Sequence, residues 1–141
     1  MIGVFREFSF VFETFDEFLA STVDLVNATK DMEGVHLVIR LHPGKKMSPE
    51  EFVSLLPPSD NLTVSSYKLP FDQVLGISDL LINFSSTVIE DALQNRIPVL
   101  LYDRRNRYQH VEAQHLTSKK AKEVNGVYYI NDSEDLKNGI E

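Results

Sequence analysis

Residues 79–91 of this 141-residue chain join a largely apolar strand pattern directly to a helix start, and this junction limits the fold more than any other feature. The run Leu80–Phe84 is apolar at almost every position, which is typical of a strand covered on both faces. Ser85, Ser86 and Thr87 follow at once, and hydroxyl residues are preferred where a helix begins. A buried strand that leads straight into a helix predicts a strand–helix unit of an α/β fold.

Strand and helix patterns alternate along the rest of the chain. A capping box, Thr14 with Glu17, predicts a helix that runs to about Thr29, and Ser48 followed by Pro49 predicts the start of another. Strands are expected at Ile2–Phe5 or Phe8–Val11, Val35–Leu41, Leu62–Ser65, Leu80–Phe84, Ile97–Tyr102 and Val127–Ile130. Further helices are expected at Pro70–Ile77, Thr87–Gln94 and His110–His115, and after an N-cap at Ser133. We therefore expect an α/β fold with a mostly parallel sheet of about six strands, in three layers.

A second strand of this kind ends at His42, where Pro43 and Gly44 force a turn. In a parallel sheet the carboxyl ends of the strands open on one crevice, so His42 and the hydroxyl residues after Leu80–Phe84 are expected to share it. An imidazole at such a place can bind a phosphate or donate a proton, although a half-exposed loop histidine is the alternative.

The residues Ser85, Ser86 and Thr87, together with the N–H groups of a helix start, would bind a phosphate. Glu90, one turn into that helix, would accept hydrogen bonds from ribose hydroxyls. Both expectations have a structural alternative, because Thr87 and Glu90 also form a capping box. Arg104 and its neighbours Arg105 and Arg107 follow a strand end and are weaker candidates for the same phosphates.

Composition excludes several classes of function. A net charge of -7 argues against a nucleic-acid surface, and the absence of cysteine excludes disulfides and thiolate metal sites. No Gly-x-Gly or Gly-Lys-Ser/Thr motif follows any expected strand, so the common NAD and ATP sites are not expected. His110 and His115 have the wrong spacing for a helical metal pair, and no metal site is predicted. We expect a cytoplasmic, soluble domain.

The motifs at Val38–Pro43, Ile77–Thr87 and Ile97–Tyr102 resemble the C-terminal, nucleotide-binding domain of glycosyltransferases built from two facing Rossmann-like domains, the GT-B fold. The likeness is closest to bacterial capsule sialyltransferases and polysialyltransferases and to CDP-glycerol glycerophosphotransferases, and it covers about residues 35–108. It implies that residues 1–141 are a Rossmann-like fragment of a longer chain and lack an N-terminal Rossmann-like partner domain.

The resemblance also implies which residues contact the donor, and which donor it is. His42, Ser85, Ser86 and Thr87 would hold the donor phosphates, and Glu90 stands where many relatives place a ribose-binding acid. The substrate would be a sugar or glycerol activated by CMP, CDP or UDP, with no other cofactor, in surface-polysaccharide synthesis. Peripheral membrane association of the full-length enzyme stays open, and the isolated chain is expected to be inactive.

Three other interpretations remain. The chain is alternatively a binding module that recognises a nucleotide or sugar phosphate without chemistry. A domain similar to UDP-N-acetylglucosamine 2-epimerases is less favoured, because Ser86 and Thr87 stand where those enzymes carry glycines. A phosphate-site protein of receiver or flavodoxin type is also less favoured, because the first expected strand end lacks the residues that such proteins use.

Overall fold

A computed structural model of the chain describes residues 3–5, 14–41, 47–66, 68–83, 88–104, 113–116 and 126–141. Within these residues seven strands form one sheet with the order β3-β2-β1-β4-β5-β7-β6, and every neighbouring pair is parallel. The strands are β1 (Gly3–Phe5), β2 (Leu37–Arg40), β3 (Leu62–Ser65), β4 (Leu81–Asn83), β5 (Val99–Tyr102), β6 (Gln114–His115) and β7 (Val127–Ile130). The chain is therefore a Rossmann-like α/β domain, as the sequence predicts.

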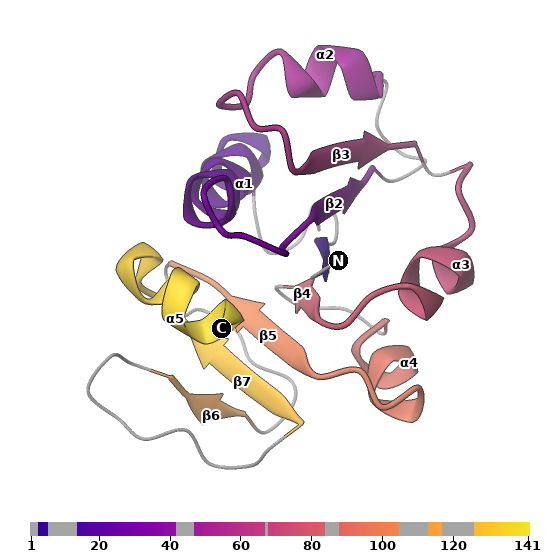
Figure 1. Cartoon of the computed structure of the whole chain (residues 1–141), viewed down its shortest axis with the longest axis vertical. Helices are drawn as coiled ribbons and strands as arrows, with labels where there is room; N and C mark the ends of the chain where they lie inside the picture. The colour runs from indigo at the N-terminus through magenta and orange to yellow at the C-terminus, as the bar shows by residue number, and fades with distance from the viewer. Residues whose placement is uncertain are drawn as a thin grey trace.

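Helices cover both faces of this sheet (Figure 1). They are α1 (Phe15–Thr29), α2 (Pro49–Val53), α3 (Phe71–Gly76), α4 (Val88–Gln94) and α5 (Leu136–Ile140), with a short 3-10 turn at Ser133–Asp135. Buried residues of α1, α2 and α5 form one hydrophobic cluster with one face of the strands, and those of α3 and α4 form a second cluster with the other face. The result is a three-layer arrangement with two cores.

The alternation of side chains along each strand explains the two cores. In β5, Leu100 and Tyr102 belong to the α1 side, whereas Val99 and Leu101 belong to the α3 side, and all four are buried. A strand that is apolar on both faces reads as a continuous apolar run, which is the pattern that the sequence shows for this segment.

Helix α1 begins where its capping box predicts. The Thr14 hydroxyl accepts a hydrogen bond from the Glu17 backbone N–H, and the Glu17 carboxylate accepts one from the Thr14 N–H. Ser48 and Glu51 form the same arrangement at the start of α2. The Phe18 and Phe52 rings lie 5.6 Å apart between their centroids, so they pack the two helices together over the sheet.

Two expectations about secondary structure are wrong. Gln114 and His115 form a strand rather than the end of a helix, because they pair with Tyr128 and Tyr129 of β7. The cap of the C-terminal helical segment is Asp132 and not Ser133, since the Asp132 carboxylate accepts from the Glu134 N–H. The remaining observed elements agree with the predicted ones within one or two residues at each end, except that α2 ends at Val53 although Pro57 and Pro58 predict a later end. The alternative first strand at Phe8–Val11 lies outside the described residues, as does His110.

The strand order locates a topological switch point between β1 and β4. From β1 the chain builds outward through β2 to β3, and it then returns through α3 to β4 on the other side of β1. In open α/β sheets, ligands bind in the crevice outside the carboxyl ends of the strands at such a point. The carboxyl ends of β1 and β4 therefore define the place to look for a site.

Candidate functional site

The residues that the sequence singles out flank this switch point along the chain. His42 follows Leu41, which continues β2 by donating its N–H to the Ser65 carbonyl at 2.9 Å. Residues 85–87 begin two positions after Asn83, the last residue of β4. Because β1, β2 and β4 are parallel neighbours, β2 and β4 end at the same edge of the sheet. His42, Ser85, Ser86 and Thr87 themselves lie outside the described residues, so the proximity of their side chains stays a prediction.

Glu90 lies in the first turn of α4 and is exposed. Its neighbours Ile89 and Ala92 are fully buried against the sheet, and they fix the orientation of the helix. Glu90 is therefore open to solvent near the carboxyl edge of the sheet. Its expected capping partner, Thr87, lies outside the described residues, so both roles stay predictions.

The starts of α1 and α2 are already occupied by carboxylates. Glu17 accepts from the Thr14 N–H at 2.9 Å, and Glu51 accepts from the Ser48 N–H at 2.8 Å. A phosphate at either start would meet a negative charge and would have to displace the capping side chain. These two helix starts are therefore not candidate anion sites.

Two side chains of the β2 segment already contact protein groups: His36, just before the strand, and Arg40, its last residue. His36 shares a hydrogen bond between its Nε2 and the Thr63 hydroxyl at 2.8 Å. Arg40 donates from Nε to the Leu69 carbonyl, just before α3, at 2.7 Å. The first bond connects the start of β2 to β3, and the second connects the end of β2 to the turn that leads into α3.

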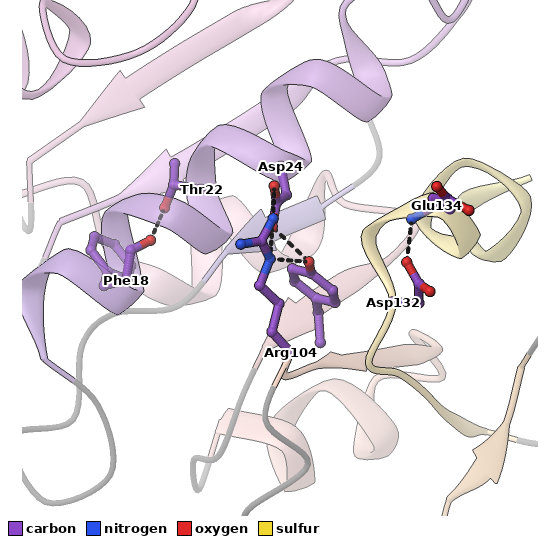
Figure 2. A network of polar contacts seen from close by, with 7 residues as sticks. Phe18, Thr22, Asp24, Arg104, Asp132 and Glu134 are labelled. Atoms are coloured by element: carbon purple, nitrogen blue, oxygen red, sulfur yellow. Dashed lines mark hydrogen bonds and ion pairs between the residues drawn. The ribbon is translucent and has the colours of Figure 1, made fainter.

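A polar network that the sequence did not predict connects α1 to the end of β5 (Figure 2). The Tyr102 hydroxyl donates to Asp24 Oδ2 at 2.7 Å, and Arg104 donates from Nη2 to Asp24 Oδ1 at 2.8 Å. Arg104 Nε lies 2.6 Å from Asp24 Oδ2, so the ion pair is bidentate. Arg104 is therefore already paired with a carboxylate, and it would have to leave Asp24 in order to contact a phosphate as the sequence predicts.

This network also changes the acidity of Tyr102. Burial raises the pKa of the Tyr102 hydroxyl well above its usual value, and the hydrogen bond to Asp24 raises that pKa further. The hydroxyl therefore stays protonated as a donor to Asp24. Asp24 and Tyr102 are 78 residues apart, so no local sequence pattern could have revealed the contact.

His115 is part of the sheet edge. Its ring stacks on Tyr129, its register partner, with centroids 4.4 Å apart, and its Nε2 lies 3.1 Å from Asn131 Oδ1. Such cross-strand pairs stabilise sheets, which accounts for the contacts of this histidine. In the part of the chain that the structure describes, no three His, Asp or Glu side chains gather as they would around a metal ion.

No protein-family model, curated protein or solved structure matches this chain. No helix among the described residues is both long and apolar enough to span a membrane.

Proposed function

We propose that this domain binds the donor nucleotide of a GT-B glycosyl or glycerophosphoryl transferase in bacterial surface-polysaccharide synthesis. The observation that carries the proposal is the strand order, which puts β1 at a switch point between the two strands that lead into the His-Pro and Ser-Ser-Thr motifs. Ligands bind at the carboxyl side of such a point. The motifs supply the groups that a phosphate needs there, in the same order as in the family that the sequence resembles.

In this proposal, different residues contact different parts of the donor nucleotide. His42 and the hydroxyls of Ser85, Ser86 and Thr87 contact the phosphates, and Glu90 accepts hydrogen bonds from the ribose. Hydrogen-bond donors fixed around the phosphate stabilise the negative charge that develops on it as the sugar or glycerol leaves. The acceptor and the catalytic base would come from the facing N-terminal domain, so the domain alone should bind the donor without turnover.

The proposal predicts weak binding with a preference among nucleotides. A site that lacks its facing domain should bind CMP or CDP near millimolar concentration, about -4 kcal/mol, with UDP as the close competitor and AMP weaker. His42→Ala and Ser86→Ala should each weaken binding by about 1–3 kcal/mol, because each removes a hydrogen bond to a charged phosphate.

Ligand-observed NMR with CMP, UMP and AMP would measure these affinities for the wild type and the variants. His115→Ala is the matched control, because its ring contacts Tyr129 on the far side of β5 from the switch point. Equal weakening in all three variants would mean that the hydroxyls only cap α4. Sugar transfer by residues 1–141 alone would contradict the assignment of the chain as one half of the enzyme.

A further inference from the structure

Arg104 can leave its carboxylate partner without leaving that carboxylate unpaired. Asp24 accepts from the Tyr102 hydroxyl at 2.7 Å as well as from the guanidinium, and the hydroxyl would remain if Arg104 moved away (Figure 2). The Arg104 side chain is 51% exposed, whereas that of Asp24 is 12% exposed. The guanidinium is therefore the accessible and exchangeable member of the network.

The position of Arg104 in the sheet brings it to the edge that contains the proposed site. Strand β5 is the direct neighbour of β4, and Leu101 is the register partner of Asn83, the last residue of β4. Arg104 follows Leu101 by three residues, so it stands past the carboxyl ends of both strands. Neighbouring strands lie about 4.8 Å apart, so Arg104 stands close to the end of β4 at Asn83.

The relative strengths of the two contacts decide which partner Arg104 takes when an anion is present. The pair with Asp24 is bidentate, but its guanidinium side is half exposed to water, which screens the attraction. A phosphate monoester accepts the same bidentate pair of hydrogen bonds and carries a charge of about -1.5 to -2 at pH 7, against -1 on the carboxylate, so it attracts the guanidinium more strongly. We propose that Arg104 exchanges Asp24 for the phosphate of the bound nucleotide, an inference that rests on the proposed function.

Removing the competing carboxylate tests this exchange. Asp24→Asn should bind CMP about two- to fivefold more tightly than the wild type, because the guanidinium is released in advance. Arg104→Ala should weaken binding about tenfold. Tyr102→Phe is the matched control, since it also removes a hydrogen bond from the network but retains the competitor, and it should not tighten binding.

A second measurement covers the case in which Asp24→Asn does not fold. In the wild-type chain, the Arg104 Nε–Hε resonance should shift as CMP is added, since its acceptor changes from carboxylate to phosphate. An Arg104 resonance that stays fixed while CMP binds, or an Asp24→Asn variant with unchanged affinity, would overturn the exchange and leave the proposed function intact. A wild-type chain that does not bind CMP would instead overturn the proposed function and, with it, this inference.

Discussion

Replacing Gly139 with alanine should destabilise the domain, although alanine is the better helix former. Gly139 is a buried residue of α5, and a Cβ built on it would overlap Ile130 Cδ1 and lie 3.6 Å from Leu100 Cδ2. Ile130 and Leu100 are each 1% exposed, so neither has free space into which it can turn. Overpacking of this kind costs about 1–3 kcal/mol, whereas glycine-to-alanine replacement gains about 0.4–1 kcal/mol. The expected net loss is therefore about 0–2.6 kcal/mol, with a central value of about 1.3 kcal/mol.

Gly76→Ala is the matched control for this prediction. Gly76 is the last residue of α3 and is exposed, and no described atom lies within 4 Å of a Cβ built there. Alanine should therefore stabilise the domain at this position by about 0.4–1 kcal/mol. Urea unfolding followed by far-UV circular dichroism would give both values. If Gly139→Ala stabilised the domain as much as Gly76→Ala, α5 would not contact the sheet as closely as described.

Three further substitutions test local features. Arg96→Gly should stabilise the domain by about 0.5–1 kcal/mol, because Arg96 adopts a φ of 60° after α4; urea unfolding should show no such gain for Asn95→Gly. Thr14→Ala should cost about 1 kcal/mol through loss of the α1 cap, and a thermal melt that matches the wild type would refute it. In the wild type, the free energy of unfolding should fall above about pH 10, because Tyr102 releases its proton in the unfolded chain while the raised pKa of folded Tyr102 retains it. Tyr102→Phe should lack this contribution to the fall. Urea midpoints that fall equally in both proteins between about pH 8 and about pH 11 would contradict this reasoning.

Local chemical signals in the sequence account for most of the fold that could be predicted. Thr14 with Glu17 and Ser48 with Glu51 define helix starts through contacts three residues apart, and both starts occur as predicted. By contrast, the two-residue strand at Gln114–His115 exists because it pairs with β7, and its own sequence carries no periodicity to reveal that pairing. The same limit applies to the N-cap at Asp132, where Ser133 next to it is an equally good capping residue.

For the candidate site, the sequence predicted the positions of the strand ends but not the order of the strands. The apolar runs before His42 and Ser85 predicted where β2 and β4 end, and their parallel arrangement followed from the alternation of elements. The position of β1 between them depends on the order of all the strands, which the sequence does not encode locally. The contact of Asp24 with Tyr102 and Arg104 likewise depends on how α1 crosses the sheet.

The central claim is that a nucleotide binds at the carboxyl edge of the sheet beside the β1–β4 switch point. The most direct test is a map of backbone amide chemical-shift changes on addition of CMP to the 141-residue chain. We expect the changes to gather at Leu41, Asn83 and Val88, which stand where β2 and β4 end and α4 begins. Changes confined to the opposite edge, around Asn61 and Gly126 before β3 and β7, would contradict the claim.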